Sequence, residues 1–104
     1  MALARFSRRT EADLVGISDH TLRTWGEDQV VRYIDALEAF CQMLAGNPSL
    51  GRSCDHIHKG LRRIATGQHV VFYRKDARGI LISRILHQRM LPERYSMDDD
   101  DDRQ

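Results

Sequence analysis

Residues 60–90 read GLRRIATGQHVVFYRKDARGILISRILHQRM, and this segment decides the fold. It holds three runs of strand length, at residues 61–66, 69–75 and 80–87, separated by breaks of two and four residues. The runs are rich in β-branched and aromatic residues, which suit a pleated, half-buried surface. Breaks this short connect antiparallel neighbours, because a parallel crossover needs a dozen or more residues. We therefore predict a three-stranded antiparallel meander.

Positive charge is threaded through this meander, at Arg62, Arg63, Arg74, Lys75, Arg78, Arg84 and Arg89. The formal net charge of the chain is only +1, but the charge is unevenly distributed. Arg and Lys number five against seven Asp and Glu in residues 1–51, ten against three in 52–97, and one against five in 98–104. A basic C-terminal half indicates an acidic partner, either nucleic acid or an acidic protein surface, although a merely solvated basic face has the same composition.

Length and composition indicate one domain, over residues 1–97 of the 104-residue chain. No apolar run reaches the length of a membrane span, and the first ten residues lack the hydrophobic stretch of a signal peptide. Two cysteines, Cys41 and Cys54, do not make a disulfide framework, so we expect a cytoplasmic protein. The acidic tail, residues 98–104, is expected to be disordered.

Two amphipathic helices are predicted before the meander. In residues 8–25 and 27–45 the apolar positions recur at spacings of three and four, which places them on one face of each helix. Gly26 allows only a tight connection, so the helices should form an antiparallel hairpin whose apolar side packs on the meander. With a short strand within residues 2–7, the predicted fold class is α+β, a helix hairpin on an antiparallel sheet. The residues expected to be largely buried are Leu14, Ile17, Trp25, Ile34, Leu37, Phe40, Leu44, Phe72 and Ile85.

The register of the last hairpin decides which side chains share a face. A turn at residues 76–79 places Lys75 opposite Ile80 and Tyr73 opposite Ile82. Continued without a break, this register pairs Val71 with Arg84 and His69 with Leu86. It predicts one face that carries His69, Tyr73, Lys75 and Arg84, and an opposite face that carries Arg74 and His87. A shift of one residue would exchange the faces.

Five histidines raise the question of a metal site. His56 and His58 lie on one side of an extended segment within a predicted loop at residues 47–59, but no second pair of ligands stands at a zinc-site spacing. The chain also lacks a Gly-x-Ser-x-Gly, a phosphate-binding glycine loop and a His-Glu-x-x-His motif. We therefore predict no metal and no cofactor.

The predicted order of strand, helix hairpin and meander resembles the RelE/ParE superfamily of bacterial toxins, and the chain is most similar to the ParE branch. The matching segments, which extend to about residue 95, are FSRRTEADL, WGEDQVVRYIDAL, NPSLGRSCD, and GLRRIATGQHVVFYR followed by GILISRILHQRM. Four segments in the correct order and spacing make the resemblance specific. The acidic residues 98–102 lie outside it.

The resemblance implies the toxin of a type II toxin–antitoxin system. Toxins of the ParE branch poison DNA gyrase and block replication, and each is neutralised by a ParD antitoxin encoded beside it. The antitoxin's C-terminal segment wraps the toxin and its N-terminal domain usually binds operator DNA. The expected partners are therefore a ParD-like antitoxin and DNA gyrase, with DNA reached only indirectly through the antitoxin and no membrane involved.

The same superfamily contains ribosome-dependent messenger-RNA endonucleases of the RelE type, which are the alternative. Those enzymes place basic residues and a Tyr or a His-Tyr pair near the end of the last strand, because cleavage needs a general base and cations for the phosphate. Here Arg62 or Arg63 matches a basic position, but the strand ends in His87-Gln88-Arg89-Met90 without a Tyr. This difference favours a gyrase inhibitor without catalytic residues. A toxin that has lost its activity and only binds its antitoxin is a third alternative.

The predicted target-binding surface is a basic patch at the end of the sheet. Charge in this segment is not needed for folding, so exposed arginines there should contribute only about 0.5 kcal/mol to stability. The residues of this predicted patch are Arg62, Arg63, Arg84, His87, Arg89 and Arg94.

Overall fold

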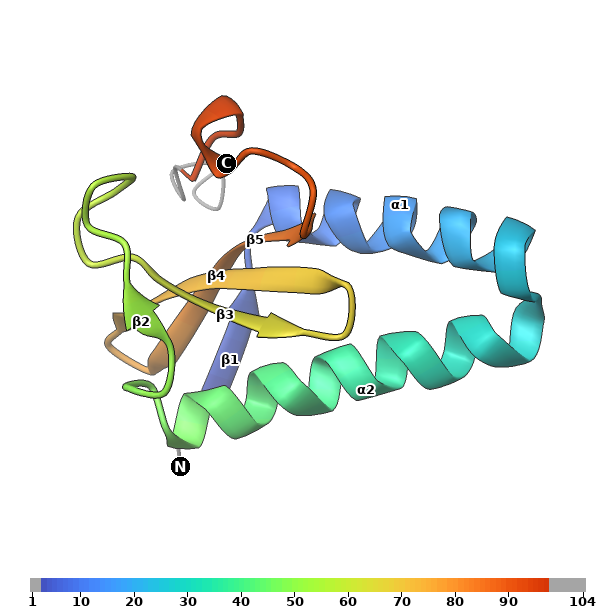
Figure 1. Ribbon diagram of the computed structural model, residues 1–104. Helices are drawn as coiled ribbons and strands as arrows, with labels where there is room; N and C mark the ends of the chain where they lie inside the picture. Colours follow the sequence, from blue (N-terminus) through green and yellow to red (C-terminus); the bar gives the residue numbers. More distant parts are fainter. Residues whose placement is uncertain (1–2, 98–104) are drawn as a thin grey trace.

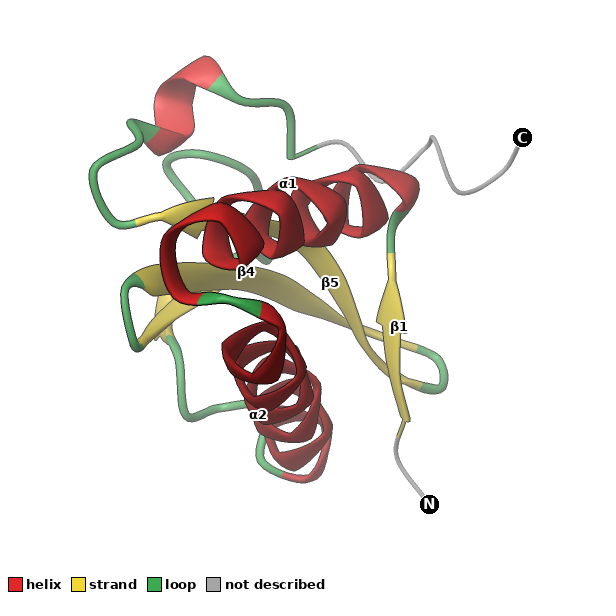
Figure 2. Ribbon diagram, turned by 90° about the vertical axis from the view of Figure 1, so that its right-hand side faces the viewer, coloured by secondary structure: helices red, strands yellow, loops and turns green. Residues whose placement is uncertain are grey.

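The computed structural model describes residues 3–97, which form a five-stranded sheet with a helix hairpin against one face (Figures 1 and 2). The expected α+β class is confirmed. The elements, in chain order, are β1 (Leu3–Phe6), α1 (Arg8–Trp25), α2 (Glu27–Gly46), β2 (Arg52–Ser53), β3 (Arg62–Thr66), β4 (His69–Asp76), β5 (Gly79–His87) and the 3-10 helix η1 (Pro92–Arg94). The region 47–59, expected to be a loop, also contains the two-residue strand β2. The prediction for residues 98–104 lies outside the described part of the chain.

The strands lie side by side in the order β1-β5-β4-β3-β2. The antiparallel meander of β3, β4 and β5 is confirmed. The sheet as a whole is mixed rather than purely antiparallel, because β1 pairs with β5 in parallel, from Leu3 opposite Gly79 to Phe6 opposite Ile82. The long stretch of chain between these two strands allows the parallel arrangement, which a tight turn would forbid.

Helix α1 begins where β1 stops pairing with β5. Ser7 caps the helix by accepting a hydrogen bond from the Thr10 backbone N–H at 3.0 Å. The Thr10 hydroxyl donates to the Ile82 carbonyl at 2.8 Å, and the Ser7 hydroxyl lies 3.0 Å from the Ser83 carbonyl. Both hydroxyl-bearing residues are fully buried. These bonds fasten the first turn of α1 to the middle of β5.

A β-bulge at the same point changes the register of the last hairpin. Lys75 lies opposite Ile80 and Tyr73 opposite Ile82, as predicted, but Phe72 is opposite Arg84 and His69 is opposite His87. Ser83 is therefore an extra residue on β5. The predicted pairs beyond this point are wrong, and the faces of Arg84 and His87 are exchanged: Arg84 leaves the face of His69 and Tyr73, and His87 joins it.

The main core lies between the sheet and the helix hairpin, as Figure 2 shows. Of the residues expected to be buried, Leu37, Leu44, Phe72 and Ile85 are buried, and Leu14, Ile17, Ile34 and Phe40 are half-buried. Trp25 contradicts the expectation, because its side chain is 70% exposed. It ends α1 at the tip of the hairpin, which extends beyond the sheet in Figure 1, so no strand lies beneath it.

A second apolar cluster covers part of the other face of the sheet. It contains Cys54 and Leu61 from the segment before β3, side chains of β4 and β5, and Met97 from the C-terminal extension. The sheet face opposite the helices is therefore not an open surface along its whole length. The segments that cover it are the one that leads into β3 and the C-terminal extension after β5, and both carry basic side chains.

Candidate functional site

The six residues of the predicted basic patch do not lie on one surface. Arg62 and Arg63 are neighbours on β3 and therefore point to opposite faces of the sheet. Arg84 and His87 lie on β5, Arg89 lies in the exposed segment after it, and Arg94 ends η1. The structure therefore distributes these residues among several separate environments.

Arg84 is largely covered and is held by an ion pair. Its guanidinium donates from Nε and Nη2 to the two carboxylate oxygens of Asp13 on α1, at 2.8 and 2.7 Å. Both side chains are only 12% exposed. The guanidinium also lies 5.5 Å from the centre of the Tyr95 ring. The expectation that Arg84 is an exposed residue with little effect on stability is therefore wrong, because Arg84 joins α1 to the C-terminal extension.

The two arginines of β3 have different surroundings. Arg62 donates from Nη1 to the Gly51 carbonyl at 2.5 Å. Arg63 places its guanidinium over the Phe72 ring, 5.6 Å from the ring centre. Both side chains are half-buried. Arg62 thus lies beside the segment that leads into β2, and Arg63 lies on the face that carries the second apolar cluster.

His87 lies in a groove between α1 and the end of the sheet. Its ring is edge-on to the ring of His69, with 5.5 Å between the two centres, and its Nδ1 accepts the Arg89 backbone N–H at 3.1 Å. The Tyr33 hydroxyl and the His69 Nδ1 are 2.6 Å apart. Sequence reasoning missed this cluster, because the bulge at Ser83 is what turns His87 toward His69.

Burial sets the protonation of this cluster. It lowers the pKa of His69, with further lowering by His87 and His20 and an opposing effect of Asp13. Burial also raises the pKa of the Tyr33 hydroxyl. The hydroxyl therefore keeps its proton and can donate to an unprotonated His69 Nδ1.

The groove itself is a predominantly apolar cleft of about 540 Å³. Gly16, Ile17 and Thr21 line it from α1, and Ile85 and Met90 line it from β5 and the segment that follows. A Cβ atom on Gly16 would meet nothing within 4 Å, so the cleft is open beside this glycine. Such a cleft can accept the apolar face of a helix.

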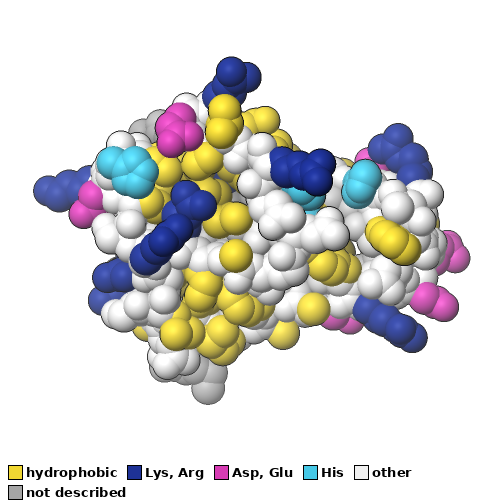
Figure 3. Space-filling model, in the orientation of Figure 1, with side chains coloured by type: hydrophobic (Ala, Val, Ile, Leu, Met, Phe, Trp, Pro, Cys, Tyr) yellow, Lys and Arg dark blue, Asp and Glu magenta, His cyan; other side chains and the backbone are white. Residues whose placement is uncertain are grey.

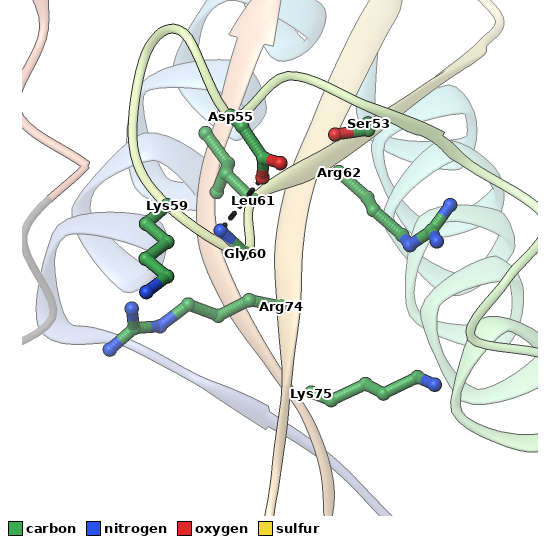
Figure 4. Close-up of a pocket in the computed structure, with 8 residues that line it drawn as sticks. All are labelled: Ser53, Asp55, Lys59, Gly60, Leu61, Arg62, Arg74 and Lys75. Carbon is green, nitrogen blue, oxygen red and sulfur yellow. Dashed lines mark hydrogen bonds between the residues drawn. The ribbon is translucent and has the colours of Figure 1, made fainter.

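A second concave region lies where β3 begins, and it is basic. It has a volume of about 400 Å³ and is lined by Ser53, Asp55, Lys59, Gly60, Leu61, Arg62, Arg74 and Lys75. Figure 4 shows the Lys59 and Arg74 side chains extending to one side and those of Arg62 and Lys75 to the other. We call this region the basic pocket. Its four cations come from a loop and two strands. Of these four residues, the sequence analysis placed only Arg62 in the predicted basic patch, because it could not show that the loop and the two strands meet.

The edge of β3 is partly open. Among residues 3–97, β2 pairs with Arg62 and Arg63 only, so residues 64–66 have no strand on that side. Leu50, Ile64, Ala65 and Val70 line a hollow there, together with two arginines. In Figure 3, apolar side chains gather over the end of the molecule where β2 and β3 lie in Figure 1, and Lys and Arg side chains stand around them.

Residues 3–97 were also compared with the side-chain clusters that hold metal ions and with helices that span membranes. Residues 3–97 contain no group of three or more His, Cys, Asp or Glu side chains that could hold a metal ion. The Nδ1 atom of His58 faces the Lys59 carbonyl and an Arg74 guanidinium nitrogen, at 3.2 and 3.5 Å. Neither helix of this part of the chain is both long and apolar enough to cross a membrane.

Comparisons with known proteins identify the family of the chain. The pattern of the family described as ParE toxin of type II toxin-antitoxin system, parDE, matches residues 4–92. The chain is 42% identical over 86 residues to Toxin ParE1 of Caulobacter vibrioides, covering 83% of this chain and 88% of that protein. It is 40% identical over 85 residues to Toxin ParE1 of Mycobacterium tuberculosis, covering 81% and 87%. The chain therefore belongs to the ParE toxin family.

A solved structure supports the fold independently. A chain from the structure titled Chromosomal ParDE TA system from P. aeruginosa superimposes with a TM-score of 0.70 and 22% sequence identity. The match covers 84% of this chain and 96% of that chain. At this identity the likeness concerns the fold alone. The acidic residues after position 97 lie beyond the family match.

Proposed function

We propose that this ParE-family toxin inhibits DNA gyrase and is neutralised by a ParD-like antitoxin. Family membership over residues 4–92 is the observation that carries the proposal, because gyrase is the usual target of the ParE branch. In this function the chain binds its target and catalyses no reaction. It reaches DNA only through its partners.

The surroundings of His87 count against the endonuclease alternative. A nuclease site needs a general base beside cations that can stabilise the phosphate. The side chain of Arg84 is occupied by Asp13, and that of Arg62 by the Gly51 carbonyl. His87 itself lies in an apolar cleft against the ring of His69. A histidine in this position suits a partner-binding surface better than a phosphate-cleaving one.

The antitoxin is proposed to use the two apolar features of the toxin surface. An antitoxin helix fits the groove between α1 and β5, with its apolar side chains against Ile17 and Ile85. An extended antitoxin segment can add along residues 64–66 of β3, where backbone groups lack a neighbouring strand. Acidic antitoxin residues beside these segments would meet the basic residues of β3 and β4.

The function is tested by expressing the toxin without antitoxin and following two readouts in parallel. We expect loss of plasmid supercoiling with accumulation of linear DNA, and intact ribosome-bound messenger RNA. Cleaved messenger RNA with unaltered supercoiling would contradict gyrase inhibition and support the endonuclease alternative. In that case His87→Ala should depress cleavage by about 10²–10⁴-fold, as expected for loss of a general base.

The antitoxin surface is tested by filling the groove. Gly16→Arg places a long side chain in the cleft without a Cβ clash, and it replaces a glycine with a better helix former. The variant should therefore fold and remain toxic but resist neutralisation by the antitoxin. Val15→Arg is the matched control, because Val15 is 61% exposed on the same helix and does not line the groove. Equal neutralisation of both variants would exclude the groove as the antitoxin site.

A further inference from the structure

Two arginines face each other across the short ladder between β2 and β3. Arg52 lies directly opposite Arg63, so both side chains stand on the same face of the sheet. Like charges in this position destabilise a pair of strands. The Arg63 guanidinium lies over the Phe72 ring, and Arg52 is exposed. Within residues 3–97, neither arginine forms an ion pair with a carboxylate.

The same two arginines line the hollow beside the open edge of β3, which has a volume of about 310 Å³. Its other lining residues are all apolar: Leu50, Ile64, Ala65 and Val70. Asp55 is the acidic residue nearest to Arg52 in the sequence, but it lines the basic pocket, where its carboxylate accepts the Gly60 backbone N–H at 2.9 Å. The hollow therefore combines apolar walls with two positive charges, and no described acidic side chain lines it.

The backbone of β3 offers hydrogen-bonding groups beside this hollow. A two-residue turn, 67–68, joins β3 to β4 and places Thr66 opposite His69. The residues that flank such a turn bond to each other, and the backbone groups of successive residues then point alternately to opposite sides of the strand. Those of Thr66 and Ile64 therefore face β4, whereas those of Ala65 face the open edge. An added extended segment can bond to Ala65 there.

We propose that the extended segment of the antitoxin carries an Asp or Glu opposite Ala65, and that its carboxylate bridges Arg52 and Arg63. Ala65 and Arg63 are two residues apart on β3 and share a face. A side chain opposite Ala65 is thus a diagonal neighbour of Arg63, about 7–8 Å away and within reach of a long side chain. Guanidinium groups bind carboxylates through paired, charge-assisted hydrogen bonds.

The same alternation defines the neighbours of this acidic residue. Side chains on either side of it point to the other face of the sheet, where half-buried Ile64 packs against the main core. Apolar side chains suit those two positions, so the segment should read apolar–acidic–apolar. A Lys or Arg at the central position would bring a third cation to the pair and be rejected. The inference rests on the proposed function for its partner and adds this chemical requirement.

Two peptides test the requirement without antitoxin or gyrase. Both are blocked pentapeptides, Thr-Val-Glu-Val-Thr and the same sequence with Gln at the centre, and binding to the full chain is followed by the backbone amide NMR signal of Ala65. We expect the Glu peptide to bind about 10-fold more tightly than the Gln peptide, because hydrogen bonds to a charged group are the stronger ones.

Two variants locate the carboxylate. Arg52→Gln should reduce the preference for the Glu peptide, and because Arg52 is exposed the change should leave the fold intact. The matched control is Arg32→Gln, which removes the same charge from an exposed position on α2 and should keep the full preference.

The outcomes separate this inference from the proposed function. An Ala65 signal that neither peptide moves, equal binding of the two peptides, or an undiminished preference in Arg52→Gln would each overturn the inference. A signal that shifts with protein concentration alone would assign the edge to a second copy of the chain and overturn it too. With the antitoxin itself, Arg52→Gln should speed dissociation and Arg32→Gln should not. An antitoxin that binds none of these chains would contradict the proposed function and leave the peptide result standing.

Discussion

Removal of Arg84 should destabilise the protein far more than removal of an ordinary surface arginine. The Arg84–Asp13 pair has two charge-assisted hydrogen bonds at 2.7 and 2.8 Å, and both side chains are 12% exposed. Removing one partner of a fully buried pair costs about 3–5 kcal/mol, because the other charge is left uncompensated. Here Asp13 keeps one hydrogen bond, from the Ile85 backbone N–H at 3.0 Å, and some water contact. We therefore expect Arg84→Ala to lower the free energy of unfolding by about 2–4 kcal/mol.

The Arg5–Asp76 pair supplies the matched control. Its shortest distance is also 2.7 Å, but its side chains are 45% and 22% exposed. Exposed pairs are worth at most about 1 kcal/mol, so Arg5→Ala should have a small effect. Urea unfolding of Arg84→Ala, Asp13→Ala and the double variant isolates the coupling within the pair, which should be about 2 kcal/mol. If Arg84→Ala costs no more than Arg5→Ala, the burial argument is wrong.

Three further predictions concern single side chains. The pKa of half-buried His69 is lowered, so the unfolded chain binds more protons than the folded one below about pH 6.5, and stability should fall as the pH decreases through this range. In urea unfolding at pH 7.5 and 5.5, His69→Gln should reduce this pH dependence of stability, and an unchanged dependence would contradict the prediction. Burial and then Glu38 raise the pKa of Cys41 to about 12, so its thiol should react with a disulfide reagent only after denaturation, and rapid labelling of the native chain would refute this. Tyr73→Phe should cost about 1–3 kcal/mol in thermal or urea unfolding, because it leaves the buried Gly51 N–H without its 2.8 Å acceptor, and a loss below about 0.5 kcal/mol would mean that this bond contributes little.

The helices and the meander could be predicted from sequence because their signals are local. Apolar spacings of three and four predicted helices at residues 8–25 and 27–45, and the observed ends of α1 and α2 differ from these by at most one residue. The short breaks in the meander require antiparallel neighbours. The parallel pairing of β1 with β5 could not be derived in this way. It depends on contacts between Leu3 and Gly79, 76 residues apart in the chain.

The candidate site was harder to predict because its geometry depends on one inserted residue. The bulge at Ser83 lies where the Ser7 and Thr10 hydroxyls donate hydrogen bonds to the Ser83 and Ile82 carbonyls. No sequence pattern within β5 indicates these hydrogen bonds. Beyond the bulge every side chain changes face. Arg84 was therefore expected on an open surface and is found against Asp13, 71 residues away.

The basic pocket shows the same limit of sequence reasoning. Charge counting placed the excess of Arg and Lys in residues 52–97 but could not say which of them converge. Lys59 comes from a loop, whereas Arg74 and Lys75 extend β4 beyond its last pair with β3, which is Tyr73 with Arg62. Their meeting depends on where β3 begins, and strand ends are the least predictable part of a local pattern.

The proposed inhibition of gyrase by this ParE-family chain is tested most directly with purified components. Gyrase is incubated with relaxed plasmid, ATP and the toxin, with and without its antitoxin, and supercoiled and linear products are separated on a gel. We predict dose-dependent loss of supercoiling with accumulation of linear DNA, and recovery when the antitoxin is added in equimolar amount. Undiminished supercoiling at toxin concentrations that arrest growth would contradict the proposed function.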